Sequence, residues 1–229
     1  MKSGKLKVAS WGRGQALGKN CRLFRQQKGY LLSDHMVKWR SISSPEGCEI
    51  ISLFWDNMTM KTLYVFRHAE AASTDRNGTD YDRPLHERGK SEAFVMGQRL
   101  LSWPKPDIII SSPALRATTT ATLLATAISY PLPRIVFDKQ VYEAEMEDLF
   151  LVIREIDDSL SCAMLVGHNP ALTQFVNILG RCDVGNMPTC SMAILRLPMD
   201  TWNDIDRIRG ELKVFDYPAK PEKSMRATR

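Results

Sequence analysis

The sequence of 229 residues lacks long apolar runs and the residue spacings that bind metals. No stretch reaches the roughly 18 consecutive apolar residues that a membrane-spanning helix needs. The five cysteines are scattered without a CxxC pair, so neither a zinc knuckle nor a disulfide framework is indicated. The four histidines show no HExxH or other paired ligand spacing. These absences predict a protein without a metal or cofactor, in a reducing, cytoplasmic setting.

The composition is that of an ordinary globular domain, with 44% hydrophobic and 25% charged residues. The formal net charge of +5 is unevenly distributed. Residues 1–57 hold 10 Lys/Arg and 4 Asp/Glu, and the rest of the chain holds 21 Lys/Arg and 22 Asp/Glu. The basic character therefore does not indicate that the main domain binds nucleic acid or a membrane.

Residues 1–57 show no sustained helical or strand period, and we expect them to lie outside the main domain. Three interpretations stay open. The segment is an artefactual upstream extension, with the true start at Met58 or Met60; or it is a disordered tail; or it is a targeting sequence, because its first 33 residues carry 8 Lys/Arg and no acid. The main domain is predicted over 58–218, followed by a polar tail over 219–229.

From residue 60 onward, short apolar runs alternate with helical apolar stripes. Strands are expected at 62–66, 107–111, 135–137, 163–167, 191–197 and 212–217. Helices are expected at 86–102, 114–129 and 145–157, and from Asn169-Pro170, as N-cap and first helical residue, to Gly180. This alternation predicts an α/β fold, a three-layer α/β/α sandwich with a mostly parallel sheet.

Two histidines and two arginines follow the ends of predicted strands: Arg67, His68, Arg116 and His168. In an open α/β sheet, ligands bind outside the carboxyl ends of the strands. Arginines neutralise a phosphate and bind its oxygens bidentately, and a neutral imidazole can attack phosphorus to form a covalent phosphoenzyme. The pattern therefore predicts phosphoryl transfer through a histidine nucleophile. Glu143, after another strand, is the candidate proton donor to the leaving group.

Several segments of the chain match the motifs of one known family. The first is Phe66-Arg67-His68-Ala69. The others are Asp82-Arg83-Pro84-Leu85 with Gly89, Ser111-Ser112-Pro113-Ala114-Leu115-Arg116-Ala117, Val141-Tyr142-Glu143-Ala144, Val166-Gly167-His168-Asn169-Pro170, Met187-Pro188-Thr189-Cys190 and Asp200-Thr201-Trp202. By these segments the chain resembles the histidine phosphatase superfamily, the phosphoglycerate mutase-like proteins, and in particular its SixA-type phosphohistidine phosphatases. The first segment resembles the Arg-His-Gly motif of that family, with Ala in place of Gly. The resemblance covers roughly residues 60–218.

The resemblance implies a role for each matching position. His68 would be the phosphorylated nucleophile, Arg67 and Arg116 would bind the phosphoryl oxygens, and His168 would stabilise them from the other side. Glu143 stands where the family often places its proton donor, although SixA-type members vary there. Arg83 is a weaker candidate for the substrate site. If residue 69 needed a positive φ, alanine there would cost about 1 kcal/mol or more.

The predicted substrate is a phosphohistidine on a protein, and rival readings stay open. The same chemistry could act on a small phosphorylated metabolite, or the domain could be a non-catalytic phosphate-binding module; a mutase is a weaker rival, because the chain has little room for a substrate lid. Two further motifs are rejected. Cys190-x5-Arg196 spans a strand-like segment without glycine, and the glycine-containing segment 12–20 lacks the spacing of a phosphate loop.

Overall fold

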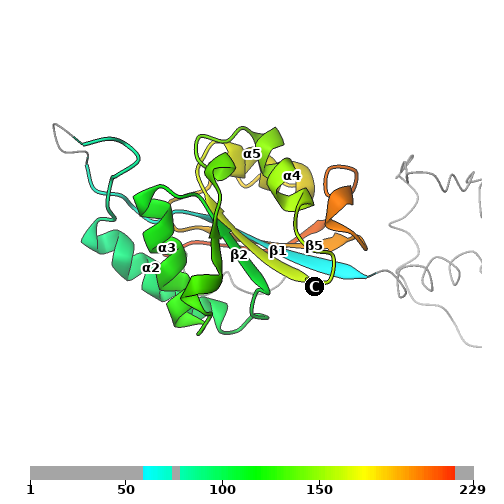
Figure 1. Ribbon diagram of the computed structural model, residues 1–229, viewed down its shortest axis with the longest axis horizontal. Coiled ribbons are helices and arrows are strands. Elements are labelled where there is room, and N and C mark those ends of the chain that lie inside the picture. Colours follow the sequence, from blue (N-terminus) through cyan, green and yellow to red (C-terminus); the bar gives the residue numbers. More distant parts are fainter. Residues whose placement is uncertain (1–58, 74–77, 220–229) are drawn as a thin grey trace, which may run out of the picture. The chain divides into compact units, whose positions relative to one another are not determined.

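A six-stranded sheet runs through the part of the chain that the computed structural model describes, residues 59–73 and 78–219 (Figure 1). The predicted extension 1–57 and almost all of the predicted tail 219–229 lie outside these residues, so the proposed domain boundaries stay predictions. Within the described residues, no helix is both long enough and apolar enough to cross a membrane.

The sheet has the order β3-β2-β4-β1-β5-β6. Strands β1 to β4 run parallel to one another, whereas β5 is antiparallel to β1 and β6 is antiparallel to β5. The predicted, mostly parallel sheet is therefore confirmed. The strands are β1 (Met60–Arg67), β2 (Ile108–Ser111), β3 (Ile135–Phe137), β4 (Cys162–Gly167), β5 (Met192–Pro198) and β6 (Glu211–Asp216).

Helices cover both faces of the sheet because β1 and β4 carry apolar side chains on both sides. Leu63 and Val65 of β1 pack in one buried cluster with α4 (Met146–Arg154) and α5 (Ala171–Gly180). Tyr64 and Phe66 point the opposite way, into a second cluster with α2 (Glu87–Leu100) and α3 (Leu115–Ala127). The result is the predicted three-layer α/β/α sandwich, visible in Figure 1 with α2 and α3 on one side of the strands and α4 and α5 on the other.

The start of α5 differs from the prediction that Asn169 is its N-cap. Pro170 occupies the cap position, and the helix begins at Ala171. The Asn169 side chain is engaged elsewhere: its amide nitrogen donates to the Met187 carbonyl oxygen at 3.0 Å, and its oxygen accepts from the Thr173 hydroxyl at 3.0 Å. The side chain therefore ties the helix to the loop before β5 instead of capping it.

Strand pairing brings the carboxyl ends of β1, β4 and β2 to one edge of the sheet. Arg67 at the end of β1 is level with Gly167 at the end of β4, and Ser111 at the end of β2 is level with Val166. The ladder continues by one residue beyond β1 and β2, because the His68 N–H donates to the Gly167 carbonyl at 3.1 Å and the Ser112 N–H donates to the Val166 carbonyl at 2.9 Å. The residues that follow these three strands therefore converge, as expected for parallel neighbours.

Gly89 in the first turn of α2 lies against the backbone that follows His68. A Cβ atom on Gly89 would stand 2.2 Å from the Glu70 carbonyl oxygen, which accepts a hydrogen bond from the His86 N–H. In an open helix, Gly→Ala would stabilise by about 0.5–1 kcal/mol. Here we expect Gly89→Ala to lower the free energy of unfolding by about 1–3 kcal/mol, because the backbone must move.

Urea denaturation checks this prediction, with Ser91→Ala on the exposed face of α2 as the control. Equal or greater stability of Gly89→Ala would show that the close approach of α2 to Glu70 does not exist.

Candidate active site

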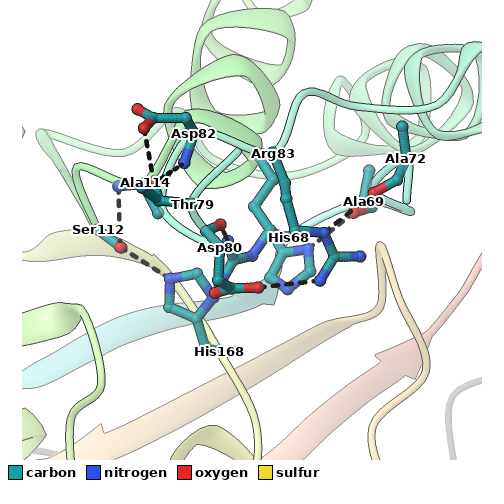
Figure 2. Close-up of polar contacts among 11 residues, drawn as sticks. His68, Ala69, Ala72, Thr79, Asp80, Asp82, Arg83, Ser112, Ala114 and His168 are labelled. Atoms are coloured by element: carbon teal, nitrogen blue, oxygen red, sulfur yellow. Dashed lines mark hydrogen bonds and ion pairs between the residues drawn. The ribbon is translucent and has the colours of Figure 1, made fainter. Parts of the chain in front are cut away.

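The two histidines predicted from the strand ends lie together. His68 follows β1 and His168 follows β4, and their ring centroids are 4.9 Å apart (Figure 2). The structure thus brings together two predicted site residues that are 100 positions apart in the sequence.

The hydrogen bonding of His68 sets its tautomer. Its Nδ1 lies 2.7 Å from the Ala69 carbonyl oxygen, which can only accept, so Nδ1 carries the proton. In the neutral ring, the lone pair is then on Nε2. The neighbouring Ala69 N–H donates to the Thr120 hydroxyl oxygen at 3.0 Å, which fixes the backbone at this point. His68 therefore has the tautomer that a nucleophile acting through Nε2 requires.

Alanine at position 69 causes no backbone strain. Among the described residues, the non-glycine positions with positive φ are Ser129, Glu143, Arg181 and Cys190, and Ala69 is not one of them. Its methyl group is fully buried in the cluster under α3. The conditional cost attached to this departure from the family motif therefore does not arise.

His168 is held by a serine that the sequence analysis gave no role. Its Nε2 lies 2.8 Å from the Ser112 hydroxyl oxygen, which also accepts from the Ala114 N–H (Figure 2). The Nδ1 of His168 is buried and has no hydrogen-bond partner among the described residues. Ser112 stands directly after β2, so it could have been anticipated from the same strand-end rule that identified the histidines.

Both imidazoles are neutral at neutral pH. Burial, with smaller contributions from the charges of Arg116, Arg67 and Arg83, lowers the pKa of His68 to about 4. Burial, followed by the effects of His68 and Arg116, lowers the pKa of His168 to about 3. Desolvation and nearby cations both disfavour the imidazolium form. His68 thus keeps its lone pair in the absence of substrate.

These low pKa values predict that neither ring titrates near the usual imidazole value of about 6.5. The ring C–H proton resonances of His68 and His168, assigned with the His68→Ala and His168→Ala variants, should not move between pH 8 and pH 5.5. The free energy of unfolding also depends on these pKa values, because below pH 6.5 the unfolded chain binds protons that the native rings exclude. Their contribution to the free energy of unfolding should therefore fall as the pH falls toward 4. Midpoints near pH 6.5 would contradict the buried environment.

Three arginines lie close enough to His68 to act on its charge, and we call Arg67, Arg83 and Arg116 the arginine cluster. All three act electrostatically on His68. Arg67 donates to the Met187 carbonyl oxygen at 2.6 Å, and its Nε is buried without a partner among the described residues. Arg116, near the start of α3, is buried. Such a cluster of guanidinium groups around neutral imidazoles is suited to binding a phosphoryl group.

A carboxylate that the sequence analysis missed links two members of the arginine cluster. The Asp80 Oδ1 lies 3.0 Å from Arg83 and its Oδ2 lies 2.8 Å from Arg116. Arg83 also donates from Nε to the Ala72 carbonyl oxygen at 3.0 Å (Figure 2). The only sequence signal for Asp80 is its position three residues before Arg83, a spacing too common to single it out.

Tyr142, also unassigned by the sequence analysis, flanks His168. The two rings meet edge to face with centroids 5.8 Å apart, and Tyr81 packs edge to face on Tyr142 at 5.1 Å. These rings form an aromatic wall beside the histidine pair.

Glu143, the predicted proton donor, is exposed and has a positive φ of 53°. Its described interaction is with Tyr142, whose pKa is raised by burial and then by the charge of Glu143. Among the described residues, no hydrogen bond, ion pair or ring contact joins Glu143 to His68 or His168. The structure thus places it near the aromatic wall but not on the histidine pair.

Cys190 is not placed as a nucleophile in a phosphate loop. It is fully buried, and burial raises the pKa of its thiol to about 12. The residues that follow it form β5, an extended strand that cannot wrap its N–H groups around an anion. The described residues also contain no group of three or more His, Cys, Asp or Glu side chains that could hold a metal ion.

Comparison with known proteins identifies the family of the chain. The family model described as the histidine phosphatase superfamily (branch 1) matches residues 63–150. An uncharacterized protein of Picosynechococcus is 33% identical over 127 residues, which are 54% of this chain and 76% of that protein.

Two solved structures share the fold. The putative phosphohistidine phosphatase SixA of Agrobacterium tumefaciens is 28% identical, with a TM-score of 0.59 over 69% of this chain and 98% of that one. The putative SixA of Nakamurella multipartitia has a TM-score of 0.60 at 23% identity, over 70% of this chain and 98% of that one. These likenesses confirm the predicted phosphoglycerate mutase-like fold class.

Proposed function

The chain belongs to the histidine phosphatase superfamily, in its SixA-type branch, and is accordingly a phosphatase; from that premise we propose that it removes the phosphoryl group from phosphohistidine in proteins, through a covalent intermediate on His68. One observation carries the proposal: a neutral imidazole, protonated on Nδ1 and free on Nε2, stands inside the arginine cluster. The charges of that cluster favour a bound phosphoryl group, and the same charges keep the nucleophile unprotonated.

In the first step, the lone pair on Nε2 of His68 forms a bond to phosphorus while the phosphorus–nitrogen bond of the substrate breaks. The bonding electrons leave with the substrate nitrogen. Arg67 and Arg116, aided by Arg83, neutralise the phosphoryl oxygens. The unpartnered Nδ1 of His168 is the second imidazole group available to these oxygens, provided that it carries the ring proton. The Ser112 hydroxyl supports that tautomer when it donates to Nε2.

In the second step, water attacks phosphorus, and the phosphorus–Nε2 bond breaks. The electron pair returns to Nε2, so His68 recovers its neutral form, and the proton of the water passes to the phosphate product. Because Nδ1 keeps its proton on the Ala69 carbonyl throughout, the ring need not turn between the two steps.

The surroundings of the histidine pair support a phosphoramidate over an alkyl ester. An alkoxide leaving group needs a proton at the atom that leaves, which a carboxylic acid normally supplies. Hydrogen bonding to Arg83, with further contributions from Arg116, lowers the pKa of Asp80, so this carboxyl is ionised. Glu143 is exposed and, within the part of the chain that the structure describes, makes no hydrogen bond with either histidine. An imidazole that is protonated on its distal nitrogen leaves as a neutral ring and needs no acid at the reacting nitrogen.

The test compares a chemically phosphorylated histidine peptide with an alkyl phosphate, in the parent protein and in Glu143→Gln. We expect kcat/KM to favour the phosphohistidine peptide. We also expect Glu143→Gln to change its turnover by less than about threefold, against the 10²–10⁴-fold typical of a lost general acid. A preference for the alkyl ester that Glu143→Gln abolishes would instead make this a small-metabolite phosphatase with Glu143 as its proton donor.

A further inference from the structure

We propose that Asp80 is an internal competitor for the phosphoryl group: its carboxylate occupies Arg83 and Arg116 in the empty enzyme, and an incoming phosphoryl group must displace it. The inference rests on the proposed function, because it assumes that these arginines bind phosphate. It adds that the anion site is filled by the chain itself between turnovers.

The contacts of Asp80 resemble those that a phosphoryl group would make. Each carboxylate oxygen meets a different guanidinium, Oδ1 with Arg83 at 3.0 Å and Oδ2 with Arg116 at 2.8 Å. Two oxygens spread over two arginines is an arrangement that a phosphate can also adopt with its oxygens. Figure 2 draws this carboxylate in front of the histidine pair.

The charge of Asp80 also affects the pKa of His168. It opposes the lowering of the His168 pKa, acting against burial and against Arg116. The carboxylate is therefore close enough to act on the group expected to contact the phosphoryl oxygens. A phosphoryl dianion and this carboxylate would repel each other strongly if both remained there.

The backbone of the loop is anchored independently of the Asp80 carboxylate. Arg116 donates to the Asp80 carbonyl oxygen, and the Leu115 N–H donates to the Tyr81 carbonyl oxygen at 3.0 Å. The Asp80 side chain itself is 55% exposed. Rotation about the Cα–Cβ bond can therefore carry the carboxylate into water without unfolding the loop. The arginines stay in place for the substrate.

Competition of this kind weakens the binding of every oxyanion, the phosphate product included. Returning to Arg83 and Arg116, the carboxylate would replace the phosphate contacts as the product leaves. Removal of the Asp80 carboxylate should consequently both strengthen product inhibition and lower KM.

The test is the dissociation constant of inorganic phosphate, measured by titration calorimetry, in the parent protein, Asp80→Asn and Asp80→Ala. The control is Asp82→Asn, the same change two residues away, where the carboxylate accepts from the Thr79 hydroxyl instead of an arginine. We expect both Asp80 variants to bind phosphate on the order of tenfold more tightly, with the inhibition constant of phosphate and KM falling in parallel. Asp82→Asn should leave all three unchanged.

Weaker or unchanged phosphate binding in both Asp80 variants would overturn the inference and make Asp80 a residue that merely positions the arginines. If the parent protein still forms a phosphoenzyme in that case, the proposed function survives. If the parent protein and the variants neither bind phosphate nor form a phosphoenzyme, both proposals fall.

Discussion

His68→Ala is expected to abolish the phosphoenzyme and to lower kcat by at least about 1,000-fold. Alanine has no lone pair to offer phosphorus, and the part of the site that remains can only bind the substrate. His168 does not replace it, because its Nε2 is engaged by Ser112, and in the tautomer that can donate to the phosphoryl oxygens its Nδ1 carries the ring proton. The covalent step should therefore be lost and not merely slowed.

Quenching the reaction in base during turnover measures this directly, because a phosphohistidine linkage survives base and is destroyed by acid. The labelled residue is then mapped by peptide analysis. His86→Ala is the matched control: His86 is exposed and its ring Nδ1 accepts from the Arg88 N–H at the start of α2. That change should lower stability by about 0.5–2 kcal/mol and leave turnover intact.

A phosphoenzyme in His68→Ala, or turnover lost in Cys190→Ala but kept in His68→Ala, would contradict the histidine mechanism. The Cys190 thiol has a pKa of about 12 and no exposed surface, so neither result is expected.

The site was predictable where it depends on strand ends. The apolar run before His68 and the run before His168 indicate buried strands, and parallel strands place their following residues at one edge. That rule places both histidines at the same edge of the sheet, and the structure brings their rings to 4.9 Å because β1 and β4 are neighbours.

The order of the strands was not predictable in the same way. Hydrophobic periodicity reports which face of an element is buried, and it does not report which strand is its neighbour. That β4 lies between β1 and β2 depends on packing between segments far apart in the sequence. The prediction that Asn169 caps α5 was wrong for a related reason. The Asn169 side chain bonds to Met187 and Thr173, and these partners are in place only in the folded chain.

Asp80 and Glu143 show why the positions of charged side chains in loops could not be predicted from the sequence. Both acids lie outside the helices and strands, and the sequence analysis chose Glu143 because it follows a predicted strand. In the structure it is Asp80 that contacts the arginine cluster, while Glu143 faces solvent. A loop side chain is directed by backbone torsions and by cations brought from other elements, and neither has a periodic signal.

Arg116→Ala is expected to lower kcat/KM by about 100- to 1,000-fold, with Arg116→Lys recovering only part of the loss. Arg116 is buried and presents a planar fork, whereas lysine offers a single point of charge. The Asp80 carboxylate is 55% exposed and can turn to water, but the Asp80 carbonyl oxygen loses its donor, so we expect the free energy of unfolding to fall by about 1–2 kcal/mol. Thermal unfolding should therefore shift by a few degrees only, while turnover falls by about two orders of magnitude or more. Arg207→Ala, which removes an exposed pair with Asp204, is the control and should change neither quantity. Full activity in Arg116→Ala would mean that the phosphoryl group does not use the guanidinium beside Asp80, and the arginine cluster would then have to be redrawn around Arg67 and Arg83 alone.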